Sequence, residues 1–269
     1  MDLSDAARER IARKLAEIAC RAGAVLRRHE RAGCAHRLKE DGSPTSAADL
    51  AAEELILAAL AETFPGVPVI AEETASTVEP GALFFLVDPL DGTRDFLHGT
   101  GEYSVNVALV AGDRPVAAAL VAPALGRAWA AGVSAATGPV DEGTLGALTP
   151  VRARPSPPEG VVALVSRRHG DDATEACLAA FAVAERRTAS SALKFALIAS
   201  GEADLYLRCG PTMEWDTAAG DHLLACAGGT VVGPDRAPLT YGHHGREYRN
   251  GAFAAVGDPA LVGRIAMAG

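Results

Sequence analysis

Residues 83–93, "LFFLVDPLDGT", join an apolar run to two carboxylates, a proline, a glycine and a hydroxyl. The apolar run predicts a buried strand, which delivers Asp88 to its C-terminal end. Pro89 fixes the next φ angle, so we expect a turn that brings Asp91 back toward Asp88. Two carboxylates held that close repel each other unless a cation lies between them. Hard divalent cations prefer oxygen ligands, so this stretch predicts a metal site.

Gly92 and Thr93 add a second kind of ligand-binding group to the same turn. Gly92 lets the backbone approach a bound group closely, and the N–H groups that follow it favour an anion. Thr93 supplies a hydroxyl. Metal ligands on one side of a turn and phosphate donors on the other suit metal-assisted phosphoryl transfer. The alternative for an isolated segment of this kind is an ordinary polar β-turn.

Two further acidic segments favour the metal site over the ordinary turn. Upstream, "VIAEET" places Glu72 and Glu73 at the end of another apolar strand. Downstream, "EWDTAAGDHLL" places Asp216 at the start of a helix, where its alternative role is an N-terminal cap.

Composition limits the classes of partner. The 269 residues are 49% hydrophobic, which is typical of a globular protein with a substantial core. The formal net charge is -9, from 25 basic and 34 acidic side chains. This charge argues against a nucleic-acid groove or an anionic membrane surface as the main partner. Small anionic ligands remain compatible with it, because a bound metal inverts the local field.

Cysteine usage and the N-terminal segment favour a cytoplasmic protein. The odd number of cysteines and the absence of a C-x-x-C pair indicate neither a disulfide framework nor a zinc knuckle. The N-terminal residues are charged and amphipathic rather than a signal peptide, and no apolar segment approaches the length of a membrane span. We expect buried thiols in a reducing compartment at Cys20, Cys34, Cys177, Cys209 and Cys226.

Periodicity predicts two leading helices and then a sheet. Ser4 can cap the first helix, and the second ends near Phe64. Short apolar runs follow between residues 67 and 134, and the short connections favour antiparallel pairing of the later strands. The apolar positions expected to face the core are Ile11, Leu15, Ile18, Ala22 and Val25 in the first helix, and Leu50, Leu57, Leu60 and Phe64 in the second.

The second half predicts an α/β layer. Residues 138–160 are rich in Pro and Gly and poor in periodic signal, so we expect a domain boundary there. Strands and helices then alternate. The strands are expected at 161–166, 203–208 and 230–233, and the helices at 173–181, 192–201 and 215–229.

The acidic segments also carry a family resemblance. The blocks "AEET", "VDPLDGT" and "EWDTAAG", in this order, resemble the inositol monophosphatase superfamily of magnesium-dependent, lithium-sensitive phosphatases. Within it the chain looks most like the bacterial 3'(2'),5'-bisphosphate nucleotidases. The segments that favour this branch are "DGSPTSAAD", "DGTRDF", "GEYSVNVALV", "VSRRHGD" and "SSALKFALIASGEADLYLR". The similarity runs from about Ser4 to Gly233.

The resemblance implies a metal site and a water-activating group. It implies two or three Mg²⁺ ions and inhibition by Li⁺. Thr93, paired with Asp49 or Glu72, would orient and activate the attacking water, and Asp49 would lie in the water or third-metal shell. The implied metal ligands are Glu72, Asp88, Asp91, Asp216 and the backbone carbonyl of Leu90.

The resemblance also implies a substrate pocket. Lys194 and Arg208 would face a second phosphate, which needs cations away from the metals. For Lys194 the alternative is a solvated or snorkelling side chain, for Arg208 a surface ion pair, and for His169 ordinary polar surface. The implied substrate-binding residues are Leu90, Asp91, Gly92, Thr93, His169, Ser191, Lys194, Arg208 and Asp216.

The fold implied is an α/β, layered α+β protein: the αβαβα sandwich of the superfamily. We expect an N-terminal α+β subdomain over residues 1–145 and a C-terminal α/β subdomain over residues 146–269, with the metal site between them. The expected reaction is magnesium-dependent hydrolysis of 3'-phosphoadenosine 5'-phosphate (PAP) to AMP and phosphate, with its sulfated analogue (PAPS) as a second candidate.

Two alternatives stay open at this point. One is a sibling phosphatase acting on inositol monophosphate or fructose 1,6-bisphosphate. The other is a catalytically silent module that binds metal or nucleotide. We expect a small-molecule partner, no nucleic acid and no membrane span, and either a monomer or a homodimer.

Overall fold

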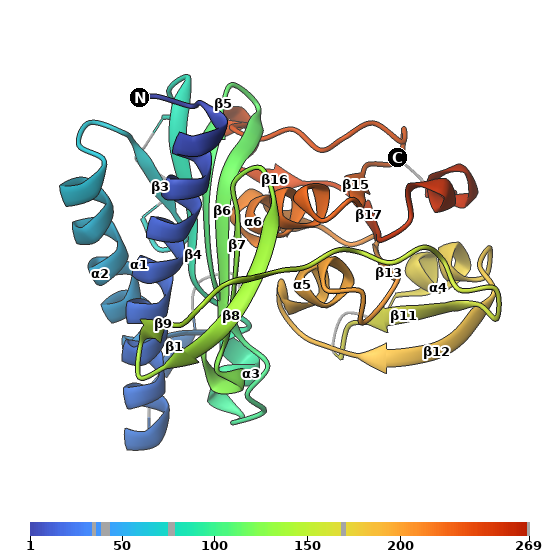
Figure 1. Ribbon diagram of the computed structural model, residues 1–269. Coiled ribbons are helices and arrows are strands. Elements are labelled where there is room, and N and C mark those ends of the chain that lie inside the picture. Colours follow the sequence, from blue (N-terminus) through green and yellow to red (C-terminus); the bar gives the residue numbers. More distant parts are fainter. Residues whose placement is uncertain (34–35, 39–43, 75–78, 168–170, 268–269) are drawn as a thin grey trace.

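The computed structural model describes residues 1–33, 36–38, 44–74, 79–167 and 171–267, which form alternating layers of helices and sheets (Figure 1). His169 and Cys34 therefore lie outside the described residues. The other four cysteines are free thiols; Cys20 and Cys177 are buried, but Cys209 and Cys226 are only half-buried. Within the described ranges, no helix has the length and apolar character needed to cross a membrane.

Two helices form the first layer, α1 (Asp5–Ala32) and α2 (Ala47–Thr63). The predicted apolar face of α1 is confirmed, since all five of its named positions are buried. Helix α1 begins after Ser4, but the Ser4 hydroxyl bonds Asp2 and makes no capping bond.

The predicted core face of α2 is only partly correct: Leu60 is buried and Leu57 and Phe64 pack against the core, but Leu50 is 45% exposed. The helix is rotated so that two carboxylates point inward with the small apolar residues. Its buried residues are Ala48, Asp49, Ala52, Glu53, Ile56, Ala59 and Leu60.

The first sheet has eight strands, and its main path runs in the order β10-β8-β7-β6-β5-β4-β3, with β9 paired to β8. The predicted antiparallel pairing of the later strands is confirmed; only β3 and β4 run parallel. Strands β9 and β10 lie inside the stretch 138–160 that seemed poor in structure, so the sheet continues past residue 145. The bounds are β3 (Val69–Ala71), β4 (Leu83–Asp91), β5 (Ser104–Ala111), β6 (Arg114–Ala122), β7 (Arg127–Ala131), β8 (Ala135–Asp141), β9 (Thr144–Leu145) and β10 (Thr149–Pro150).

The second sheet has five strands in the order β12-β11-β13-β17-β15. The three predicted strands and three predicted helices of this half are all present. Strand β12 was missed because it is a polar edge strand, and β17 was missed although it is fully buried. The bounds are β11 (Val161–Val165), α4 (Asp172–Leu178), β12 (Val183–Thr188), α5 (Leu193–Ala199), β13 (Leu205–Arg208), α6 (Glu214–Cys226), β15 (Thr230–Val232) and β17 (Phe253–Val256).

Helices α5 and α6 separate the two sheets. Their apolar residues share one buried cluster with side chains of β6 and β7 on one side and β11, β13 and β17 on the other. Helix α4 covers the far face of the second sheet, and α1 with α2 covers the far face of the first (Figure 1). The predicted αβαβα layering is therefore confirmed. The division at residues 145 and 146 stays a prediction.

Short elements complete the chain. Helix α3 lies directly after β4 and holds Thr93 at its first position. The remaining bounds are β1 (His36–Leu38), β2 (Pro44–Ser46), α3 (Thr93–Leu97), η2 (Pro123–Leu125), β14 (Thr212–Met213), η3 (His244–Arg246), β16 (Arg249–Asn250) and η4 (Pro259–Arg264).

Candidate metal and phosphate site

A bulge in β4 places Asp88 and Asp91 on the same face of the sheet. The expected turn is not found, because the strand runs on to Asp91. Asp88 pairs with Asn106 and Asp91 with Ser104, so three steps along β4 match two along β5. Side chains alternate along a regular strand, and residues three apart would point to opposite faces. The extra residue restores the shared face.

Four carboxylates, those of Glu72, Asp88, Asp91 and Asp216, lie close enough here to affect one another's pKa values. Burial raises the pKa of Asp88 well above its usual value, and the negative charges of Glu72, Asp91 and Asp216 raise it further. Burial likewise raises the pKa of Asp216 to about 7, with Asp91 as the next cause. Four acidic groups that destabilise one another's charged forms require a proton or a cation.

Three different segments deliver these carboxylates. Glu72 follows β3, and its N–H donates to the Val87 carbonyl, so β3 and β4 end side by side. Asp216 lies in the first turn of α6, where its Oδ2 accepts from the Met213 N–H at 2.9 Å. The capping role weighed for Asp216 is therefore real, and it orients the carboxylate beside the end of β4.

The donor set fits a hard cation such as Mg²⁺. In the parts of the chain that the structure describes, no three His, Cys, Asp or Glu side chains close on one point as a finished metal-binding group. The four carboxylates nevertheless offer hard oxygen donors in a buried place with excess negative charge. Two buried oxygens near them, Asn106 Oδ1 and Thr212 Oγ1, find no hydrogen-bond partner among the described residues. Water molecules on a bound cation would supply the hydrogen-bond partners that these two oxygens lack.

A second group of contacts surrounds Thr93. Its hydroxyl lies 3.2 Å from Asp49 Oδ1 and 3.1 Å from the Leu90 carbonyl. The other Asp49 oxygen accepts from the Ser46 N–H at 2.8 Å and from the Ser46 hydroxyl at 2.6 Å. Burial raises the pKa of Asp49. Of the two partners weighed for Thr93, the observed one is Asp49.

The carboxylates open into a cavity of about 290 Å³. Its lining combines acidic and basic side chains, and it brings together most of the residues that the sequence singled out. It is lined by Glu72, Asp91, Gly92, Thr93, Arg94, Asp95, Ser166, Ser190, Ser191, Ala192, Lys194, Phe195, Tyr206, Arg208, Thr212, Asp216, Thr217 and Phe253.

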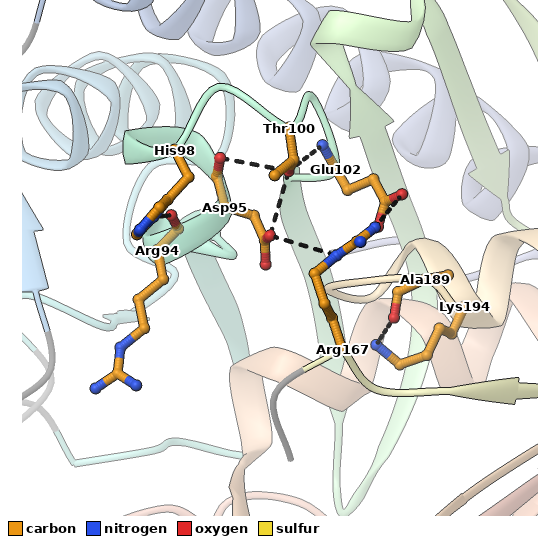
Figure 2. A network of polar contacts seen from close by, with 8 residues as sticks. All are labelled: Arg94, Asp95, His98, Thr100, Glu102, Arg167, Ala189 and Lys194. Carbon is orange, nitrogen blue, oxygen red and sulfur yellow. Dashed lines mark hydrogen bonds and ion pairs between the residues drawn. The ribbon is translucent and has the colours of Figure 1, made fainter. Parts of the chain in front are cut away.

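Lys194 is the buried cation of this cavity. Its Nζ donates to the Ser191 carbonyl at 2.7 Å and to the Ala189 carbonyl at 3.4 Å (Figure 2), and it lies 4.7 Å from the centre of the Tyr206 ring. Burial lowers the pKa of Lys194 to about 8, although Asp91 acts in the opposite direction. The alternative of a solvated or snorkelling side chain is wrong, because the residue is only 3% exposed.

Arg208 and Ser191 line the same cavity as Lys194. Arg208 donates to the Pro211 carbonyl at 2.9 Å, and its buried Nε has no hydrogen-bond partner among the described residues. Ser191 adopts a positive φ of 58°, which is uncommon for a residue with a Cβ. This conformation aims the Ala192 N–H at Asp91 Oδ2.

Some residues of the site were missed from the sequence. Asn106 donates to Asp91 Oδ2 at 3.3 Å from the neighbouring strand, and Tyr206 packs beneath Lys194. Asn106 belongs to the quoted block "GEYSVNVALV", where a polar side chain between apolar residues of a buried strand was the available signal. For Tyr206 there was none, because it alternates like any core residue of a strand.

The protein is thus a layered α/β sandwich with a cavity that is lined by carboxylates and by cationic side chains. This arrangement is suited to binding a cation and an anion side by side. Residues 7–261 match the inositol monophosphatase family, and the chain belongs to that family.

Curated relatives include the 3'(2'),5'-bisphosphate nucleotidase CysQ of Salmonella typhimurium. It is 39% identical over 197 residues, which cover 72% of this chain and 77% of the relative. The CysQ of Escherichia coli strain K12 is 37% identical over 206 residues, covering 76% of this chain and 81% of the relative.

A solved structure with a similar fold is the Bacteroides thetaiotaomicron CysQ, a bacterial member of the inositol monophosphatase family. It has a TM-score of 0.78 and 28% sequence identity, and the match covers 93% of this chain and 97% of that one. The expected family and fold are confirmed.

Proposed function

We propose that this protein is a magnesium-dependent 3'(2'),5'-bisphosphate nucleotidase that hydrolyses PAP to AMP and phosphate, with PAPS as a second substrate. One observation carries the proposal: a single cavity is lined by three acidic residues, Glu72, Asp91 and Asp216, and by two cations, the buried Lys194 and the half-buried Arg208. A bisphosphate substrate needs both kinds of group, metal ligands for the reacting phosphate and cationic side chains for the second phosphate. The CysQ relatives, which are named for this activity, support the same substrate class.

The metal ligands in this proposal are carboxylates from three segments. Glu72, Asp88, Asp91 and Asp216, with the Leu90 carbonyl, would hold two or three Mg²⁺ ions, and we expect Li⁺ to inhibit. Bound Mg²⁺ lowers the pKa of a coordinated water and stabilises the leaving oxygen in an in-line displacement. Asn106 and the Ala192 N–H would steady Asp91, because both donate to its Oδ2.

Thr93 and Asp49 would position and deprotonate the attacking water. The Thr93 hydroxyl donates to Asp49 Oδ1, which leaves its lone pairs to accept a hydrogen bond from the water. Asp49 is held by Ser46 and has a pKa raised by burial, and a more basic carboxylate is a better proton acceptor.

The substrate would lie between the two ends of the cavity. Backbone N–H groups of Gly92 and Thr93 would hold oxygens of the reacting phosphate. Lys194 and Arg208 would bind the second phosphate, and Ser191 would line the nucleotide pocket together with His169. The division into subdomains 1–145 and 146–269 is part of the same proposal, with the substrate bound between them.

The sibling activities remain second candidates. An inositol monophosphate has no second phosphate for Lys194 and Arg208 to bind, whereas a bisphosphate has one. A silent binding module would have no use for the Thr93–Asp49 contact. Both observations favour the nucleotidase.

The deciding experiment measures phosphate release with Mg²⁺ on PAP, inositol 1-phosphate and fructose 1,6-bisphosphate. We expect kcat/KM to be highest for PAP. A preference for either sugar phosphate would retain the metal site but overturn the roles of Lys194 and Arg208. Silence on all three substrates would support the non-catalytic module.

A further inference from the structure

Arg167 forms a bridge across the mouth of the cavity. It follows Ser166, a lining residue at the end of β11 in the second sheet. Its Nη2 lies 3.0 Å from Glu102 Oε1, and its Nε lies 3.9 Å from Asp95 Oδ1 (Figure 2). Both acidic partners belong to the segment between β4 and β5. The ion pairs therefore connect the two sheets beside the site.

Hydrogen bonds of Thr100 connect the two acidic residues. Asp95 is 5% exposed and lies on α3, two residues after Thr93. The Thr100 hydroxyl donates to Asp95 Oδ1 at 3.2 Å, and the Glu102 N–H donates to the Thr100 hydroxyl at 3.3 Å. Glu102 Oε2 is buried and has no hydrogen-bond partner among the described residues. Asp95 is therefore held in place, whereas the Glu102 side chain is 25% exposed and its Oε1 contacts Arg167.

These carboxylates act on the phosphate-binding end of the cavity. Asp95 lines the cavity, and the negative charges of Asp95 and Glu102 both act to raise the pKa of Lys194. Two negative charges at this place repel a substrate that carries two phosphates. Arg167 is 43% exposed, so its ion pairs add little to folding stability. We therefore expect the ion pairs of Arg167 to affect substrate binding more than the free energy of unfolding.

We infer that Arg167 is a positioning residue for substrate charge. It neutralises Asp95 and Glu102, so that the cavity accepts a bisphosphate whose charges the two carboxylates would otherwise repel. The inference rests on the proposed nucleotidase function, and it deepens that function by assigning the preference for highly charged substrates to the bridge.

The test compares Arg167→Met with the wild-type holoenzyme. We expect KM for PAP to rise roughly tenfold and kcat to stay within about twofold, because the negative charges of Asp95 and Glu102 are then no longer offset by Arg167 and act on substrate binding at short range. KM for 2'-AMP, which carries one phosphate, should rise about threefold or less. Arg167→Lys should keep most of the wild-type KM because it keeps the charge.

Two further variants identify the cause. Adding Glu102→Gln to Arg167→Met should recover about half of the loss on a logarithmic scale, because one of the two repelling charges is removed. Arg186→Met is the matched control. Arg186 forms an exposed ion pair with Glu175 at 2.8 Å, away from the cavity lining, and its loss should leave both KM values unchanged.

An unchanged KM in Arg167→Met would overturn the inference, and so would equal rises in KM for PAP and 2'-AMP. A rise in KM that Glu102→Gln does not relieve would also overturn it, because Arg167 would then be a direct phosphate ligand. Calorimetric titration of PAP in EDTA tests the same point without turnover, and Arg167→Met should weaken Kd about tenfold. Wild-type inactivity on PAP would overturn the proposed function alone, and the Kd comparison would still decide on Arg167.

Discussion

At the scale of single residues, the site depends on carboxylates that are costly to keep charged. Asp88 and Asp216 are buried, and each has a pKa raised first by burial and then by neighbouring negative charge. A folded protein tolerates such a cluster when a cation or protons compensate it. Perturbed carboxylates of this kind cluster at functional sites, which supports the proposed metal site.

Asp91→Asn tests the metal-ligand role directly. It removes one negative charge from the cluster, so we expect kcat for PAP to fall by at least about 100-fold. The loss of a residue that only supports a metal ligand already costs about 10- to 100-fold, and the loss of a ligand itself should cost more. The free energy of unfolding without metal should not fall, because a repelling charge is lost. Steady-state kinetics and urea unfolding measure the two quantities.

The matched control is Asp113→Asn, an exposed aspartate in the turn between β5 and β6. It should behave as wild type in both measurements. Wild-type turnover by Asp91→Asn at saturating Mg²⁺ would contradict the metal-ligand role.

Lys194→Met tests the second phosphate. The substitution keeps the apolar stem and removes the charge, so we expect KM for PAP to rise about 10- to 100-fold, as for the loss of a charge-assisted hydrogen bond. KM for 2'-AMP should change far less. Lys14→Met, on the exposed face of α1, is the control. Equal rises for both substrates would contradict the assignment.

At the scale of elements, the bulge in β4 and the close approach of α5 to α6 set the geometry of the site. The bulge turns Asp88 and Asp91 to one face. Gly220 of α6 lies against the Phe195 side chain of α5, where an added Cβ would come within 2.4 Å of the ring. Phe195 is adjacent to Lys194, so this contact fixes the cationic end relative to Asp216.

Gly220→Ala tests that contact. The extra methyl group must push α5 away, so we expect a loss of roughly 1–3 kcal/mol in the free energy of unfolding, typical of overpacking, together with a higher KM for PAP. Chemical denaturation and steady-state kinetics check both effects.

Gly263→Ala lies in η4, where an added Cβ meets nothing within 4 Å, and it should leave both quantities nearly unchanged. A Gly220→Ala variant as stable as wild type would show that the two helices do not need to approach so closely.

At the scale of the whole molecule, the site joins the first sheet to the helices that lie between the two sheets. Glu72, Asp88 and Asp91 come from the first sheet, whereas Asp216 and Lys194 come from the helices between the sheets. A cation held by the carboxylates of the first sheet and of α6 would stabilise the fold by mass action.

Mg²⁺ should therefore raise the midpoint of thermal unfolding. At 100 times its dissociation constant, a ligand of the native state adds about 2.7 kcal/mol. NaCl at matched ionic strength is the control, because salt alone screens the net charge of -9. Asp91→Asn should lose most of the Mg²⁺ effect. An equal shift with NaCl would mean that Mg²⁺ acts only by screening.

The sequence by itself determined most helices and strands, the acidic segments and the family resemblance, which in turn implied the layered fold. These features are local: an apolar run, a helical period or a short motif is readable wherever it occurs. Strand β12 escaped because its side chains are polar, and the face of α2 was misjudged because Asp49 and Glu53 are turned inward against the usual pattern.

Only the tertiary structure decided which distant side chains touch. The bulge opposite β5, the contact between Thr93 and Asp49, the burial of Lys194 over Tyr206 and the bridge from Arg167 to Asp95 and Glu102 all join segments far apart in the chain. Charge and hydrogen-bonding energies depend on separation in space and on burial, and a residue's own neighbours in sequence do not fix either quantity.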